Sequence, residues 1–164
     1  MSERLVVIAD AGPIIALGIA GQLDILGQLF GRVVVPEAIY VEVVVQGRGR
    51  PGSSELARAS WAERVVVTPP PDALLAEELG PGEAEAIALS VRRHADLLLI
   101  DERKGRRIAT LAYNLHVKGT AGVLVLAKRR GLVPSVRPLL ETMRAGGYYL
   151  AESLVDLAAR EVGE

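Results

Sequence analysis

The sequence contains no cysteine, and this absence removes several kinds of chemistry at once. Disulfide frameworks, thiolate zinc sites and cysteine nucleophiles all need the missing side chain. Histidine is nearly absent too, with only His94 and His116 among the 164 residues. A histidine-rich metal site is therefore excluded, and any metal would have to be a hard cation held by carboxylate oxygens.

Long apolar runs are absent as well. The segment that follows Arg4 starts like a signal peptide, but Asp10 and Pro13 interrupt it. No run approaches the roughly 20 residues that a membrane-spanning helix needs. We therefore expect a cytoplasmic protein that has no membrane partner.

Neither sign of charge dominates the chain. The net charge of −1 argues neither for nor against a nucleic-acid partner. All but three of the 19 basic residues are Arg, and the guanidinium group favours bidentate contacts with phosphate. This bias is compatible with a partner that contains phosphate.

What the sequence does contain is a regular alternation of short apolar segments and helical patterns. Residues 5–9 and 97–100 are unbroken apolar segments bounded by polar residues, which is typical of buried strands. Pro36 is expected to open a helix that Gly47 closes. Fully apolar strands that alternate with helices predict an α/β fold, with a central parallel sheet flanked by helices on both faces.

The chain is predicted to form one domain. Its 164 residues are half apolar and 24% charged, which is enough to bury a core but short for two domains. Residues 1–164 are therefore treated as a single domain, in which residues 146–164 form a C-terminal helical extension. Tyr148 and Tyr149 are expected to pack among these C-terminal helices.

The apolar segment before Asp101 and Glu102 has the form of the second acidic motif of an ATPase. Such an enzyme also needs a G-x-x-x-x-G-K-[ST] loop, whose amides and Lys cradle the phosphates. The two candidate segments, residues 21–28 and 80–87, have no Lys followed by Ser or Thr. The ATPase interpretation is therefore excluded.

Two protein classes carry a phosphate-accepting aspartate after the first strand, and this sequence fits neither. The haloacid-dehalogenase pattern would place a second Asp two residues after Asp10, where this chain has Gly12. A receiver domain would need an acidic pair before its nucleophile strand and a Lys after a later strand. Neither feature can be placed in this sequence.

Two acidic residues are predicted at the ends of strands. Asp10 ends the first apolar segment, and Asp101 ends the segment 97–100. Ligand sites of parallel α/β sheets lie beyond the carboxyl ends of the strands. If the two strands are near neighbours, both carboxylates face one crevice. A simple turn or cap role explains either residue equally well.

Two further acids come from predicted helices. Residues 38–45 are apolar nearly all round except for Glu42, which predicts a largely buried helix. A buried unpaired carboxylate is costly, so Glu42 is favoured as a functional residue over a surface residue. In the next helix, Glu83 lies at the edge of the predicted core face and Glu85 lies on the outward side. Glu83 is the better candidate, and Glu85 is an accessory or a solvated residue.

Carboxylates gathered in one pocket repel each other unless cations neutralise them. Mg²⁺ or Mn²⁺ is the usual answer, and a metal-bound water can then attack a phosphodiester. A basic cluster directly follows Asp101 and is predicted to hold the backbone of a nucleic acid. A solvated helix face is an equally good interpretation of any one of its members, which are Arg103, Lys104, Arg106 and Arg107.

With Asp10, Glu42, Glu83 and Asp101 in this order, the sequence resembles the PIN-domain nucleases. It is most similar to the VapC-related branch of prokaryotic toxin-like proteins. The similarity extends over roughly residues 4–145, and its matching segments are IADAGPIIAL, VVVPEAIYVEV, LGPGEAEAIALS, ADLLLIDERKGRR and VKGTAGVLVLAKRRGLV.

This resemblance implies an endoribonuclease that depends on Mg²⁺ or Mn²⁺ and hydrolyses RNA. It makes the four acids the catalytic metal ligands, and it suggests that Gly119 and Thr120 shape the rim of the site, where Thr120 would contact the substrate. Such proteins are often dimeric and are often restrained by a small antitoxin. A homodimer and an antitoxin partner are therefore expected.

The sequence departs from the family pattern at two positions. Many PIN domains carry a Ser or Thr two residues after the first Asp, where this chain has Gly12. Many also carry a Thr two residues before the last Asp, where this chain has Leu99. These absent hydroxyls leave two alternatives open: a PIN-like scaffold that binds RNA or protein without cutting it, and a small-molecule phosphohydrolase.

Overall fold

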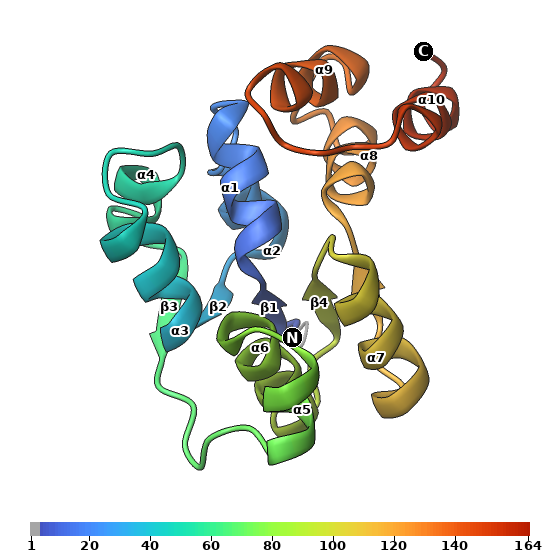
Figure 1. Ribbon diagram of the computed structural model, residues 1–164. Coiled ribbons are helices and arrows are strands. Elements are labelled where there is room, and N and C mark those ends of the chain that lie inside the picture. The colour runs from blue at the N-terminus through green and yellow to red at the C-terminus, as the bar shows by residue number, and fades with distance from the viewer. Residues whose placement is uncertain (1–3) are drawn as a thin grey trace.

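The computed structural model of the protein describes residues 4–164 (Figure 1). Its centre is a five-stranded sheet in the order β3-β2-β1-β4-β5, in which every neighbouring pair of strands is parallel. The strands are β1 (Val7–Ala9), β2 (Val33–Pro36), β3 (Ala62–Val65), β4 (Leu97–Leu99) and β5 (Val117–Lys118). The predicted α/β fold with a central parallel sheet is confirmed.

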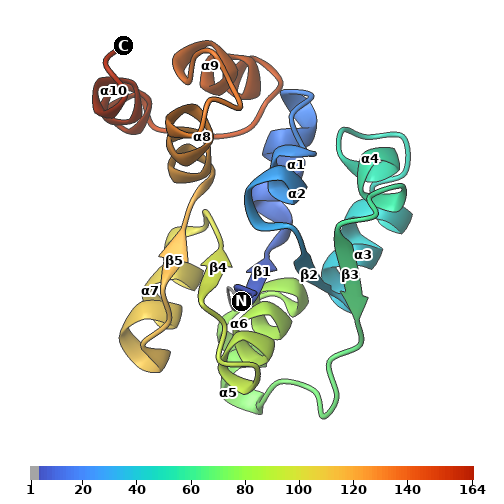
Figure 2. The same cartoon turned by 180° about the vertical axis from the view of Figure 1, so that it is seen from behind.

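Helices surround this sheet in both views (Figures 1 and 2). They are α1 (Ala11–Ile19), α2 (Ile25–Phe30), α3 (Glu37–Tyr40), the π-helix η1 (Val41–Gln46), α4 (Ser53–Ala57), α5 (Ala73–Glu78), α6 (Pro81–Arg92), α7 (Arg103–Tyr113), α8 (Thr120–Arg129), α9 (Arg137–Ala145) and α10 (Glu152–Glu161). Helix α6 packs on β1, β2 and β4, and α2 packs on β2. None of the helices in residues 4–164 has the length and apolar character that a membrane crossing requires.

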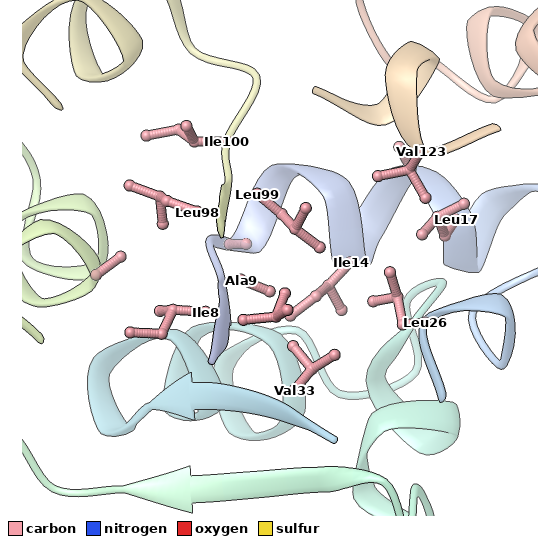
Figure 3. Packing of buried hydrophobic residues seen from close by; sticks show 14 of the residues in the cluster. Ile8, Ala9, Ile14, Leu17, Leu26, Val33, Leu98, Leu99, Ile100 and Val123 are labelled. Carbon is pink, nitrogen blue, oxygen red and sulfur yellow. The ribbon is translucent and has the colours of Figure 1, made fainter. Parts of the chain in front are cut away.

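The apolar strands are buried on both faces of the sheet. Figure 3 shows Leu98 and Ile100 on one side of β4 and its continuation, with Leu99 on the other side. All three side chains are fully buried. Successive strand residues point to opposite faces, so an unbroken apolar segment is what a sheet covered on both faces requires.

The strand order reverses between β1 and β4. From β1 the chain builds β2 and β3 towards one edge, and then returns to build β4 and β5 towards the other edge. At such a reversal the connecting segments leave the sheet in opposite directions, which opens a crevice beyond the carboxyl ends of the two central strands. Asp10 follows β1 and Asp101 lies two residues after β4, so both acids lie at this crevice.

The segment that carries Glu42 differs from its prediction. We expected a largely buried helix over residues 38–45, but Glu42 is exposed and Val45 is 59% exposed. The reason is that α3 and η1 pack on α6, α4 and neighbouring elements with one side only. From Val41 the helix also widens into π-type turns, a feature that is frequent at functional sites.

The C-terminal segment returns to the carboxyl edge of the sheet. Helix α9 packs on α1, and α10 packs on α8 and α9. The connector between them, residues 146–151, crosses the molecule beyond the ends of the strands (Figure 1). The predicted C-terminal helical extension thus contains one helix, α10, preceded by an extended connector.

Candidate active site

A cleft of about 660 Å³ opens at the carboxyl ends of β1 and β4. Its walls come from the starts of α1, α6 and α7, from η1, and from the connector between α9 and α10. One basic residue, Arg103, lines it within residues 4–164. The acidic residues that line it are Asp10, Glu42, Glu83, Asp101 and Glu102. The structure therefore brings together the four acids that the sequence analysis selected and adds Glu102.

Asp10 is the most buried of these acids, with 6% of its surface exposed. It precedes α1 in the position of a helix cap, but its carboxylate makes no capping hydrogen bond. The pKa of Asp10 is raised to about 6, mainly by burial and in addition by the negative charges of Glu42, Asp101 and Glu102, while the nearby Ala11 N–H works in the opposite direction. Asp10 is therefore a buried acid in an anionic environment, and the simple cap interpretation fails.

Glu83 lies in the first turn of α6 and faces the cleft. Within the described part of the chain, its Oε2 atom is the buried side-chain oxygen that has no hydrogen-bond partner. The pKa of Glu83 is raised to about 7, mainly by burial and in addition by the charges of Asp10 and Glu102. When Glu83 is protonated it can donate a hydrogen bond to Glu102, which raises the pKa of Glu83 and lowers that of Glu102. Once Glu83 has lost this proton, its buried oxygen has no donor and is free to accept a cation.

Glu85 has a different role from Glu83. Its Oε1 atom accepts a hydrogen bond of 3.0 Å from the backbone N–H of Ala38, in the first turn of α3. It therefore satisfies one of the free N–H groups at a helix start. The prediction that Glu85 is an accessory acid or a solvated residue is wrong, because its carboxylate joins α6 to α3.

Asp101 is held by three hydrogen bonds. The Thr120 N–H donates to Oδ1 at 2.7 Å, and the Thr120 hydroxyl donates to Oδ2 at 2.5 Å. The Tyr148 hydroxyl also donates to Oδ2. The cap of α7 is instead Glu102, which accepts from the N–H groups of Lys104 and Gly105 at 3.1 and 2.6 Å. Asp101 is therefore free of the helix-cap role that was its alternative explanation.

Thr120 and Tyr148 both differ from their predicted roles. Thr120 was predicted to contact the substrate, but it is completely buried and both of its donors hold Asp101. Tyr148 was predicted to pack among the C-terminal helices, but its half-buried ring lines the cleft. Burial raises the pKa of Tyr148, and the charge of Asp101 raises it further. The sequence carries no periodic signal for Tyr148, because it lies in a connector.

Glu102 was considered only as part of the excluded ATPase motif. Burial works to raise its pKa, but the hydrogen bonds from Gly105 and Lys104 outweigh this effect and lower it. Its position directly after Asp101 is the signal that identifies it, since consecutive residues after a strand reach the same edge of the sheet. Glu102 thus adds negative charge to the cleft while it caps α7.

The predicted basic cluster divides into separate roles. Arg103 is exposed and lines the cleft. Lys104 lies 3.1 Å from Glu78, and Arg106 donates to the carbonyl of Ile100 at 3.0 Å. Arg107 is exposed on α7 and does not line the cleft. The structure therefore brings Arg103 alone of these four to the acidic cleft.

Two glycines lie beside the acids of the cleft, and one of them is required for space. A Cβ atom at Gly82 would lie 3.9 Å from both Asp10 Oδ1 and Glu42 Oε1. A Cβ atom at Gly105 would lie 2.9 Å from Glu83 Oε2 and 3.4 Å from an oxygen of Glu102. The 3.9 Å distances at Gly82 are ordinary van der Waals contacts, whereas a side chain at position 105 would crowd Glu83, so the space beside Glu83 depends on glycine at position 105.

The chemistry of the cleft fits a hard divalent cation. All candidate ligands are carboxylate oxygens, the cluster gathers five acids, and the ionised Glu83 Oε2 has no donor beside it. Among residues 4–164, no three His, Cys, Asp or Glu side chains already approach one another closely enough to hold a metal ion. Binding would therefore have to draw the carboxylates together.

Comparison with known families identifies one match. The family model DUF3368, described as a PIN domain, matches residues 6–164. No curated protein and no solved structure matches the chain. The matched region contains every acidic residue of the cleft, as well as Thr120 and Tyr148.

Proposed function

The chain belongs to the PIN-domain family, whose members have a nuclease-type fold, and from this premise we propose that it is an endoribonuclease dependent on Mg²⁺ or Mn²⁺. The observation that supports this most is the convergence of Asp10, Glu42, Glu83 and Asp101 in one cleft. These acids come from distant parts of the chain, and a cluster of carboxylates is stable at neutral pH only when protons or cations neutralise it.

Asp10, Glu42, Glu83 and Asp101 are the residues that would hold the metal. When bound, a divalent ion supplies an activated water and stabilises the leaving oxygen of a phosphodiester. Asp10 and Glu83 have pKa values of about 6 and about 7 in the metal-free protein. They can therefore release protons near neutral pH as the ion binds, and in doing so Glu83 gives up its hydrogen bond to Glu102.

RNA binding is proposed on the basis of Arg103 and the family resemblance. Arg103 is the basic residue at the cleft among residues 4–164, and it is exposed. A guanidinium group there can contact a phosphate adjacent to the scissile one. The acids repel a nucleic acid that lacks a bridging cation, so substrate and metal are expected to bind together.

We also propose that the protein is the toxin of a toxin–antitoxin pair, restrained by a small antitoxin and active as a homodimer. The resemblance to the VapC-related branch supports this role. Expression of the wild-type chain should then stop growth of a bacterial host, and expression of Asp10→Asn should not. Equal growth of both strains would count against the toxin role. It would not bear on the hydrolytic activity, which the RNA cleavage assay tests separately.

A non-catalytic scaffold is the second candidate, and one observation favours it. Both oxygens of Asp101 already accept hydrogen bonds from the protein, and the acids are not yet close enough to hold an ion. Calorimetric titration with Mn²⁺ separates the two candidates. A nuclease site binds the ion, whereas a scaffold gives no heat above the dilution background.

The direct test is cleavage of a fluorescent single-stranded RNA with Mn²⁺, with Mg²⁺ and with EDTA. We expect cleavage with either metal, none with EDTA, and a loss of about 100-fold or more in Asp10→Asn and Glu83→Gln, since each removes a metal ligand. Glu77→Gln is the matched control, because Glu77 is exposed on α5 and outside the cleft. Wild-type rates in Asp10→Asn, with circular dichroism unchanged, would exclude this mechanism.

A further inference from the structure

The ring of Tyr148 fills the space in front of Gly12. A Cβ atom added at Gly12 would lie 2.8 Å from the Tyr148 hydroxyl oxygen and 3.7 Å from Asp101 Oδ2. Contacts below 3.0 Å are essentially never seen for real Cβ atoms. A side chain at position 12 and the tyrosine hydroxyl therefore cannot both keep these positions, so one of them must shift, and both would lie beside the same oxygen of Asp101.

Two glycines bring Tyr148 to this place. Gly147 has a φ of 94°, in the left-handed region that glycine adopts without strain. At Gly146 a Cβ atom would clash with Ile19 Cγ2, so the connector can pass α1 in this position only without a side chain there. The Tyr148 N–H then donates to the carbonyl of Met143 at 3.0 Å, which ties the turn to the end of α9.

The next residue in the chain has the opposite environment. Tyr149 is 87% exposed, whereas the hydroxyl of Tyr148 points into the cleft and donates to Asp101 Oδ2. The Thr120 hydroxyl donates to the same oxygen from α8. Asp101 is thus held from two directions, by a helix that starts beside it and by a connector that arrives from the C-terminal region (Figure 1).

We propose that Tyr148 is a positioning residue of the active site, whose hydroxyl takes the place of the side-chain hydroxyl that position 12 lacks and holds Asp101 in the acidic cleft. This inference rests on the proposed function, because Asp101 matters as a metal ligand only if the protein binds metal. It deepens that function by making the connector between α9 and α10 part of the site. It also accounts for Gly12, since a serine there and a tyrosine at position 148 compete for one space.

The first test needs no metal and no substrate. In the wild-type background, Gly12→Ala should lower the Tm by about 3 °C or more, because the new methyl group meets the Tyr148 hydroxyl. In the Tyr148→Phe background that hydroxyl is absent, and the same substitution should leave the Tm unchanged or raised, since Ala favours a helix more than Gly. An equal effect of Gly12→Ala in both backgrounds would overturn the proposed juxtaposition.

The second test measures the affinity for Mn²⁺ by calorimetry. Tyr148→Phe should weaken binding by about 10-fold or more, the usual effect of removing a hydrogen bond to a metal ligand. Adding Gly12→Ser to Tyr148→Phe should restore part of this loss, because a serine hydroxyl can extend from 3.7 Å to hydrogen-bond distance of Asp101 Oδ2. Gly12→Ser alone should impair binding, since Tyr148 is still in its way. Tyr113→Phe, at the far end of α7, is the matched control.

The outcomes separate this inference from the proposed function. If Tyr148→Phe binds Mn²⁺ as tightly as the wild type or more tightly, the hydroxyl does not position Asp101 for the metal and the inference fails while the nuclease proposal stands. If the wild type itself binds no Mn²⁺, the proposed function fails, and with it the role of Tyr148 towards a metal. The Tm coupling between positions 12 and 148 then still decides whether Tyr148 occupies the place of a side chain at position 12.

Discussion

Asp10 and Asp101 follow neighbouring parallel strands and lie at the same edge of the sheet, where the Asp10 N–H donates to the carbonyl of Leu99 at 2.9 Å. This backbone contact places the two acids on either side of the point where the strand order reverses. A shared site for both carboxylates is therefore a product of the sheet topology, and it needs no long or flexible loop.

Replacing Asp10 should separate stability from activity. In the folded protein the pKa of Asp10 rises from 3.8 to about 6, so the ionised carboxylate destabilises the folded state by roughly 3 kcal/mol. Asp10→Asn removes this charge. The metal-free variant should therefore unfold about 5 °C or more above the wild type at pH 8, although its activity is lost. Differential scanning calorimetry in EDTA measures this shift. A lower Tm of Asp10→Asn would show that the ionised carboxylate stabilises the fold.

The metal-free protein should lose stability as the pH rises from about 5 to about 7. Asp10 and Glu83 have raised pKa values of about 6 and about 7, so they bind protons more tightly in the folded state than in the unfolded state. Their contribution is complete below their ordinary pKa values and is lost as the pH passes through the raised values. Urea unfolding at several pH values in EDTA measures the decline.

Two other acids act in the opposite direction but at lower pH. The pKa values of Glu102 and Glu164 are lowered, that of Glu164 to about 2, so their contribution is present above their ordinary pKa and is lost only as the medium becomes acidic. Saturating Mn²⁺ should abolish the decline between pH 5 and 7, because the cation replaces the protons on Asp10 and Glu83. A decline that persists with Mn²⁺, or that is unchanged in a variant carrying both Asp10→Asn and Glu83→Gln, would contradict this explanation.

Glu85 and Glu83 should respond differently to removal. Glu85→Ala leaves the Ala38 N–H without its acceptor and should cost about 1 kcal/mol of unfolding free energy, as the loss of a helix cap does. Its affinity for Mn²⁺ should stay near that of the wild type. Glu83→Ala should do the reverse, with weaker metal binding and an unchanged or higher stability. Urea unfolding and calorimetric titration of both variants check this contrast. Weak Mn²⁺ binding by Glu85→Ala would show that Glu85 contributes to the metal site.

Arg103 should contribute more to RNA binding than Arg107. Both are exposed on α7, but Arg103 lines the acidic cleft and Arg107 does not. Arg103→Ala should remove one phosphate contact and reduce the slope of log K against log salt by about 0.7 for single-stranded RNA. Fluorescence anisotropy with a non-cleavable RNA at several salt concentrations measures this slope. The same or a larger change of this slope in Arg107→Ala would show that the RNA binds outside the cleft, along another part of α7.

The sequence was sufficient to predict the acids at the ends of two strands and the acid on one face of a helix. Asp10 and Asp101 were found because an unbroken apolar segment that ends in an acid is typical of a buried strand with a site at its edge. Glu83 was preferred to Glu85 because the angle between successive helix residues separates the two side chains. Both patterns depend only on residues close together in the sequence, so they can be recognised without knowing which elements pack together in the fold.

Other features depended on tertiary structure. Residues 38–45 are as apolar as a buried helix, yet Val45 is exposed, because the number of neighbouring elements limits burial more than composition does. The role of Thr120 could not be inferred from its position at a helix start alone, since the acceptor of its hydroxyl, Asp101, is 19 residues away. Tyr148 lies in a connector, where no periodicity exists, and its contact with Asp101 follows from the turn at Gly146 and Gly147.

The connector that carries Tyr148 also sets the order in which the cleft is completed during synthesis. All five acids have left the ribosome well before residue 148 does, so a growing chain carries the full anionic cluster while Asp101 still lacks its second hydroxyl partner. A translation product that stops before residue 148 keeps every carboxylate and loses this contact. The assembled cleft therefore requires the chain at least as far as residue 148, and a product that stops earlier cannot reproduce it.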